Sequence, residues 1–101
     1  MTGAQPPSHE GYAALVGTTF TADIEPAGTV ALELVDCSSL VTANGWQSYS
    51  LSFRGHAATP LGQGTYIFTV DGLEPLAIFI VPVRADAHGV EYEAHFTMQE
   101  G

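Results

Sequence analysis

A chain of 101 residues can bury one hydrophobic core and is too short for two domains. Apolar residues make up 46% of it and charged residues 13%, which argues against intrinsic disorder, because disorder requires low hydrophobicity and high charge. The chain has 11 acidic residues, 2 arginines and no lysine, so its net charge is −9. Because nucleic acids and anionic membranes bind basic residues, neither is expected as a partner. The missing lysine also excludes Schiff-base chemistry, and no cofactor is expected.

Cys37 is the single cysteine, so no disulfide can form within the chain. Small secreted domains usually carry several disulfides, so we expect either a reducing interior or no dependence on the redox environment. The start of the chain has neither the basic residues nor the apolar run of a signal peptide. The longest apolar stretch, residues 76–83, is too short to cross a bilayer as a helix. We therefore expect a cytoplasmic location at synthesis and leave the final location open.

The first residues are polar and contain prolines. This predicts a flexible lead-in over residues 1–10, followed by a single domain over residues 11–101. Ser8 could cap one short helical turn near its end, although the segment is too short to form a stable helix alone.

Apolar and polar residues then alternate over residues 18–24 and again over residues 30–35, the period of a half-buried strand. Pro26-Ala27-Gly28 lies between the two segments and is a turn signal. The two segments are therefore expected to form a hairpin. Residues 36–46 are less regular and end in Asn44-Gly45, a second turn signal.

The later strands are separated by glycine- and proline-containing turns. Clear alternation returns in three segments, and a fourth is apolar on both faces, as in a strand covered on both sides. The alternating segments are residues 48–53, 66–70 and 90–96, and the apolar one is residues 76–83. The pattern predicts an all-β domain of about six mostly antiparallel strands, in a small barrel-like meander or a two-layer sandwich. We favour the barrel.

Several stretches in this order carry a family likeness. They are LVGTTF at residues 15–20, SLSFRG at 50–55, LGQGTY at 61–66, LAIFIVPV at 76–83 and YEAHF at 92–96. The combination resembles a family of short bacterial proteins classed as a domain of unknown function. The resemblance implies a bacterial source. Such proteins are sometimes encoded near phage-tail-collar-like proteins, which favours a part in an extracellular or tail-derived assembly, and no site residue is carried over.

One candidate metal site lies on the last expected strand. Glu91, Glu93 and His95 share one face, and two carboxylates with an imidazole could hold a divalent ion. Metal sites usually draw three or four ligands from more than one element. A solvated outer face is therefore the favoured interpretation, and no metal site is assigned.

Two further residues are candidate contact points. Arg54 could anchor an anion through its guanidinium, but acids are so abundant that an ion pair is favoured. Trp46 follows the Asn-Gly turn and could close one end of the core or stand exposed as an interface anchor. Core closure is the favoured position for Trp46.

Hydroxyl and thiol groups give no catalytic pattern. Ser48, Ser50 and Ser52 alternate along one strand near His56, but no Gly-x-Ser-x-Gly elbow exists. The serines are expected on a solvated or partner-facing surface. No basic residue is near Cys37, which is expected to be a packing residue.

These observations favour a non-enzymatic β module that acts through protein–protein contacts, with a protein partner or self-association, as an accessory or structural component of a bacterial assembly. The alternative is a small-ligand-binding barrel, with an enzyme as one version of it. Such a ligand pocket would be lined by aromatic residues, namely Trp46, Tyr49, Tyr66 and Tyr92. A third interpretation is an acidic domain stabilised by calcium.

Overall fold

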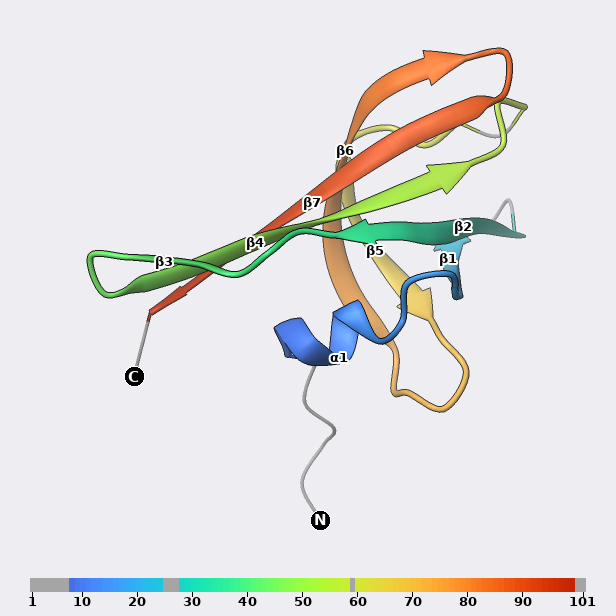
Figure 1. The fold of residues 1–101 in the computed structure, drawn as a ribbon. Helices are drawn as coiled ribbons and strands as arrows, with labels where there is room; N and C mark the ends of the chain where they lie inside the picture. The colour runs from blue at the N-terminus through green and yellow to red at the C-terminus, as the bar shows by residue number, and fades with distance from the viewer. Residues whose placement is uncertain (1–7, 25–27, 59, 100–101) are drawn as a thin grey trace.

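The computed structural model of the chain describes residues 8–24, 28–58 and 60–99. One short helix precedes seven antiparallel strands (Figure 1). The elements are α1 (His9–Ala13), β1 (Thr19–Ile24), β2 (Gly28–Cys37), β3 (Val41–Ala43), β4 (Trp46–Gly55), β5 (Gly64–Thr69), β6 (Leu76–Asp86) and β7 (Gly89–Gln99). No described helix has the length and apolar character needed to cross a membrane.

Six of the strands close into a barrel. Their order is β2-β1-β5-β6-β7-β4, and pairing of β4 back onto β2 closes the ring, while β3 pairs with β4 outside it. The barrel expected from the alternating pattern is therefore confirmed, as are the antiparallel strands. The meander is interrupted once, because the chain leaves β4 and crosses the barrel end to reach β5, between β1 and β6.

The first hairpin has the expected partners. β1 and β2 pair from Thr19 opposite Glu33 to Ile24 opposite Gly28. The predicted turn at residues 26–28 lies largely outside the described residues, which resume at Gly28. The Asn44-Gly45 turn is confirmed: both residues have positive φ, as a tight two-residue hairpin turn requires, and they join β3 to β4.

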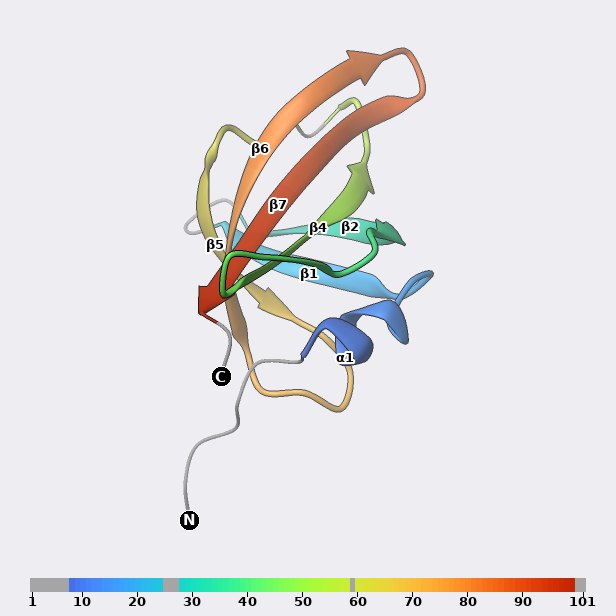
Figure 2. The ribbon, with the colours of Figure 1, turned by 60° about the vertical axis from the view of Figure 1, so that its left-hand side comes forward.

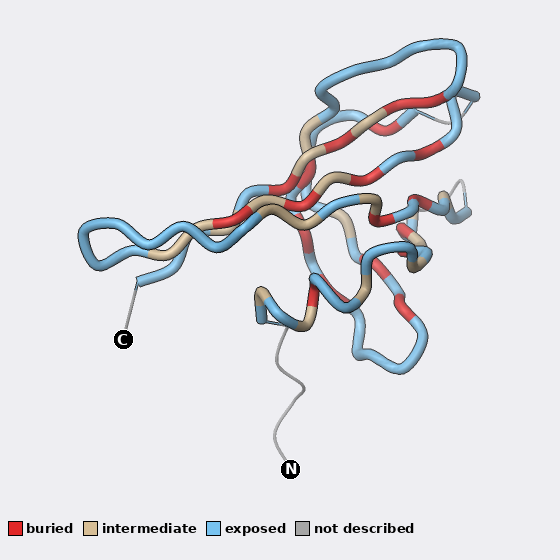
Figure 3. Tube along the Cα trace, in the orientation of Figure 1, coloured by how far each residue is buried: buried red, intermediate tan, exposed pale blue. Residues whose placement is uncertain are grey.

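Apolar side chains from alternate positions fill the barrel interior. Three phenylalanines form its centre: the ring of Phe53 stacks on Phe68 at 5.8 Å and meets Phe20 edge-on at 5.1 Å between ring centroids. All three are fully buried, together with Leu51 and Ile80. Aromatic pairs with these geometries contribute about 0.5–1.5 kcal/mol beyond the burial of their surface. The interior is therefore a packed core (Figure 3).

Helix α1 begins earlier than the expected domain boundary. Ser8 caps it by accepting a hydrogen bond from the backbone N–H of Gly11, as the sequence suggested. Residues 8–10, predicted to be lead-in, are thus part of the folded unit, whereas residues 1–7 lie outside the described residues. Tyr12 is buried and packs in the core. This packing stabilises α1, because a helix of five residues would not be stable alone.

The expectation that residues 76–83 are covered on both faces is wrong. Leu76, Ile78 and Ile80 are buried, but the alternate residues Ala77 and Phe79 are exposed. A closed barrel of this size has one interior and no second layer over β6, so the outer apolar face of that strand stays at the surface.

The crossover from β4 to β5 is held by a buried hydrogen bond. Leu61 lies in this loop and is buried at the barrel end, and its backbone N–H donates to the phenolic oxygen of Tyr92 at 2.8 Å. Tyr92 is fully buried on β7, so its ring belongs to the core while its hydroxyl satisfies a loop amide.

Tyr92→Phe should lower the free energy of unfolding by about 1–3 kcal/mol, because it leaves the buried N–H of Leu61 without a partner. Urea denaturation of the purified domain measures the change. The matched control is Tyr66→Phe, which removes an exposed hydroxyl that donates to the carbonyl of Gly62 and should cost no more than about 0.5 kcal/mol. Equal losses in the two variants would contradict this role for Tyr92.

Two glycines allow the β6–β7 turn to approach the end of β4. Gly89 has φ of +154°, and a Cβ atom there would overlap the carbonyl oxygen of Gly55. Gly55 itself lies against Leu32 and Tyr92, where a Cβ would fall 2.5 Å from Leu32 Cδ2. This end of the barrel closes because neither position carries a side chain.

Gly89→Ala should therefore destabilise the domain by about 1–3 kcal/mol, through unfavourable φ and overlap with backbone that has little room to move. Gly62→Ala is the control, since its Cβ would meet nothing within 4 Å. Thermal or urea unfolding compares the two. A Gly89→Ala protein as stable as the Gly62→Ala protein would show that the close approach is not a real constraint.

Candidate functional site

A three-stranded arm projects from the barrel (Figures 1 and 2). It consists of residues 40–48, which include β3 and the start of β4, and residues 97–99 at the end of β7. In register, Trp46 lies between Ala43 on β3 and Gln99 on β7. We call these residues the β arm.

The β arm carries no charge. Residues 37–53 contain no acidic, basic or histidine side chain, in a chain whose net charge is −9. Residues 97–99 are also uncharged. The side-chain pattern predicts residues 36–46 only as an irregular stretch with a turn, and residues 48–53 as a strand. The lack of charge, together with the Asn44-Gly45 hairpin signal, was the sequence feature that could have identified the arm.

Large apolar side chains are exposed on both faces of the arm. Val41 and Trp46 are 56% and 50% exposed and share the outer face, since Val41 lies opposite Ser48, two residues from Trp46. Leu40 and Met98 are exposed on the other side, where they help line a groove of about 300 Å³ between the arm and α1. Figure 3 shows the tip of the arm as exposed, in contrast to the barrel strands.

Aromatic packing fixes the root of the arm to the barrel. The ring of Phe96 stacks on Tyr12 at 5.4 Å and on Tyr49 at 5.1 Å between centroids. His9 meets the ring of Tyr49 edge-on at 4.9 Å, and its Nε2 donates to the carbonyl of Ser38 at 2.8 Å. Burial, then the neighbouring Tyr49, raises the pKa of Tyr12 to about 12, so its phenol stays protonated at neutral pH.

Trp46 is placed by this geometry on the arm and not in the core. The expectation that it closes the core is wrong, because Trp46 is 50% exposed. The reason is that β4 and β7 extend beyond the barrel, where no described element lies opposite the first residues of β4.

Arg54 lies on the barrel, in a row of alternating charge. It is directly opposite Glu33 on β2 and Glu91 on β7, and Glu91 is in turn opposite Arg84 on β6. Opposite charges at facing cross-strand positions stabilise a sheet. Within the described ranges the one ion pair is that of His95 with Glu93, so the register places acids beside Arg54 without assigning it a bonded carboxylate partner.

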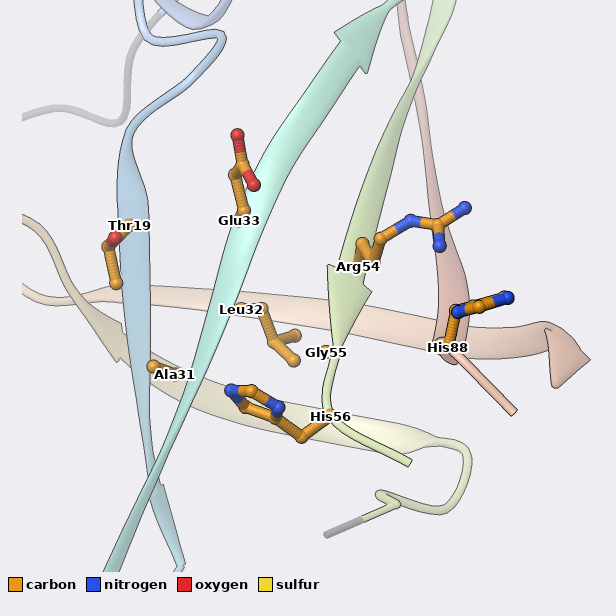
Figure 4. Close-up of a pocket in the computed structure, with 8 residues that line it drawn as sticks. All are labelled: Thr19, Ala31, Leu32, Glu33, Arg54, Gly55, His56 and His88. Atoms are coloured by element: carbon orange, nitrogen blue, oxygen red, sulfur yellow. The ribbon is translucent and has the colours of Figure 1, made fainter. Parts of the chain in front are cut away.

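Arg54 also borders an open cleft of about 280 Å³ at one end of the barrel, together with His56 and His88. Figure 4 shows that these side chains do not converge: Arg54 and His88 lie on one side of Gly55, and His56 lies on the other, toward Ala31. Nearby, the N–H groups of His88 and then Gly89 hold the pKa of Asp86 below its usual value. Among the described residues that line it, the cleft brings together no set of reactive groups.

A protein-family model described as a domain of unknown function, DUF6916, matches residues 7–96. The chain belongs to the DUF6916 family. This confirms the resemblance to a domain of unknown function. Searches of curated proteins and of solved structures found no match. The match includes α1, the whole barrel and the hairpin of the β arm.

The three candidate metal ligands of this DUF6916 domain are on the outer face of β7. His95 Nε2 lies 2.9 Å from Glu93 Oε1, an exposed pair. Glu91 is two residues further along, opposite the two arginines. Within the described ranges, no three His, Cys, Asp or Glu side chains are grouped so that they could hold a metal ion.

The serines and the cysteine of the DUF6916 domain lie along β4 and β2. Ser48, Ser50 and Ser52 are half-buried on the outer face of β4. Cys37 is half-buried against the core, and burial, followed by the charge of Asp36, raises the pKa of its thiol. A raised pKa reduces the thiolate fraction, as expected for a packing residue.

The four aromatic residues proposed to line a ligand pocket are not brought together. Tyr49 and Tyr92 are buried in the core, Tyr66 is half-buried on β5 with its hydroxyl on the carbonyl of Gly62, and Trp46 is on the arm. The barrel interior between them is occupied by the phenylalanine cluster.

Proposed function

We propose that this DUF6916 domain is a non-enzymatic β module that acts through protein–protein contacts, with the β arm as its contact surface. The observation that carries the proposal is the exposure of Val41 and Trp46 on one face of an uncharged arm, and of Leu40 and Met98 on the other. Exposed apolar groups gathered in one place are typical of interaction surfaces, whereas isolated ones are not.

The composition of the arm is that of an interface centre. Contact surfaces are depleted of charge at their core and enriched in aromatic residues and methionine, and a tryptophan can contribute much of the binding energy. The arm has Trp46 and Met98, together with neutral Ser, Thr, Asn and Gln side chains. Binding there would desolvate no charged group, which avoids the main cost of burying an acidic surface.

The barrel supplies a rigid base for the arm. Its packed core and the aromatic cluster at the arm root hold the projecting strands in one orientation. A rigid contact surface loses little conformational entropy on binding, which favours affinity. These features suit a structural or accessory component of a larger assembly, the role that the family resemblance favours for a bacterial, tail-derived complex.

The small-ligand alternative finds less support. A ligand barrel needs an open interior with converging polar groups. The aromatic residues expected to line such a pocket lie apart, and the groups around the cleft at Arg54 point in different directions. We therefore retain the contact module as the proposed function.

Replacing Val41 and Trp46 together by serine should abolish protein contacts without unfolding the domain, because both side chains are half-exposed or more. The measurement is native mass spectrometry of the purified protein, alone and with proteins that co-purify from its source. We expect the wild type to self-associate or to retain a defined protein, and the double variant to lose at least about tenfold in affinity.

The matched control replaces Ile67 and Phe79 by serine. These residues are 48% and 49% exposed on β5 and β6, so the control removes similar apolar surface elsewhere. The control should leave the affinity for the partner unchanged.

A wild-type protein that is strictly monomeric and retains no protein would overturn the proposed function. Loss of binding only in the control variant would show that the contact surface is on β5 and β6 and not on the arm.

A further inference from the structure

The hydrogen bonds of Ser50 show which neighbouring strand the N–H and C=O groups of each β4 residue face. Its N–H donates to Ser38 Oγ at 2.8 Å, and its carbonyl accepts from the N–H of Ser38 at 2.9 Å. Both groups therefore face the β2–β3 side of β4. Successive residues of an antiparallel strand face opposite sides, so Tyr49 and Gln47 face β7.

The same alternation continues across to β7. Phe96 lies opposite Tyr49 and Met98 lies opposite Gln47, so their backbone groups are the ones bonded to β4. The backbone N–H and C=O groups of His95, Thr97 and Gln99 must then face the other edge of β7.

In the described part of the chain, that other edge of β7 is open over the last six residues of the strand. The pairing of β6 with β7 ends at Val81 opposite Glu93, and β6 then turns to pair with β5 alone. Among the described residues, no strand pairs with this edge of residues 94–99. Proteins usually protect such an edge with charges, proline or a bulge, and residues 94–99 contain no proline, acid, lysine or arginine.

We propose that a second copy of this chain docks on this edge, with the two β7 strands pairing antiparallel about a two-fold axis at Thr97. The proposal rests on the proposed function and names the partner of the β arm. It would join the two arms into one continuous six-stranded sheet, a form of strand addition in which the backbone supplies the hydrogen bonds.

The edge is self-complementary in this register. Thr97 pairs with Thr97 of the second copy, and His95 pairs with Gln99 of the second copy, so that all backbone groups facing the edge find partners. Phe96 and Met98 lie on the other face of the sheet, the face that borders the groove between the arm and α1. There Phe96 would lie opposite Met98 of the second copy, once on each side of the two-fold axis. Sulfur–aromatic contacts and Thr–Thr pairs are both favourable across strands.

Charge favours a second copy at this surface. Two molecules of net charge −9 repel one another over most approaches. This repulsion is weakest when the two molecules approach through their arms, because residues 37–53 and 97–99 are uncharged. Among the described residues, the acid next to this edge is Glu93, whose Oε1 lies 2.9 Å from His95 Nε2. Glu100 follows Gln99 directly in the sequence, outside the described residues.

The test compares two prolines placed on the two edges of the same arm. Thr97→Pro removes an N–H that faces the proposed dimer and spares the hydrogen bonds to β4. Thr42→Pro is matched, because Val41 and Ala43 face β4 and Thr42 faces the outer edge of β3. Proline is tolerated at such outward-facing edge positions, and circular dichroism with urea denaturation checks that both variants fold.

Sedimentation equilibrium of the full chain from about 1 μM to about 1 mM gives the dissociation constant. We expect the wild type to dimerise within this range, Thr97→Pro to raise the dissociation constant at least about tenfold, and Thr42→Pro to change it by less than about twofold. Equal weakening by both prolines, or weakening by Thr42→Pro alone, would overturn pairing through β7.

A charge pair tests the register without changing the backbone. His95→Lys with Gln99→Lys would set like charges opposite each other across the axis and should prevent dimerisation. His95→Lys with Gln99→Glu would set opposite charges there and should restore it. Failure of this rescue would overturn the register centred on Thr97.

The two proposals fail in different ways. A wild type that stays monomeric to about 1 mM, but still binds another protein through Val41 and Trp46, would overturn self-pairing and leave the contact module intact. A monomer that binds no protein would overturn both.

Discussion

The pairing of β4 with β7 is the interaction on which the rest of the structure depends. It runs without a register shift from Trp46 opposite Gln99 to Gly55 opposite Val90. One half of this ladder lies in the barrel wall, where β2 and β6 flank it, and the other half extends beyond the barrel as the β arm. The same two strands therefore produce both a packed core and an unpacked projection, and the alternation of side chains continues unchanged from one to the other.

What differs between the two halves is the layer that they face. In the barrel, Leu51 and Phe53 meet side chains from the opposite wall and are fully buried. At the arm root, α1 takes the place of that wall, and Tyr12 covers Phe96. Beyond α1 nothing in the described part of the chain covers the strands, so Trp46 and Met98 remain exposed. The contact function that we propose for the arm rests on this geometry, since an apolar surface and an open strand edge both gain from a partner.

Side-chain periodicity predicted the parts of the fold that depend on local pattern. The alternation over residues 48–53 identified which residues of β4 face the core, and the Asn44-Gly45 signal located the β3–β4 turn. Periodicity tells which side of a strand a residue faces, but it does not tell whether that side is covered. This is why Trp46 was expected in the core and why residues 76–83 were expected to be buried on both faces. The crossover from β4 to β5 could not be predicted either, because it depends on Leu61 and Tyr92, which are far apart in the chain.

In the described part of the chain, the last residues of β7 bond to β4 on one side and leave the other edge unpaired. Residue-resolved amide hydrogen exchange in a dilute sample tests it most directly. We expect slow exchange at Phe96 and Met98 and fast exchange at His95, Thr97 and Gln99. The exchange of the second group should become slow as the protein concentration rises. Slow exchange at Thr97 in the dilute monomer would contradict it, because another part of the molecule would then already cover the edge.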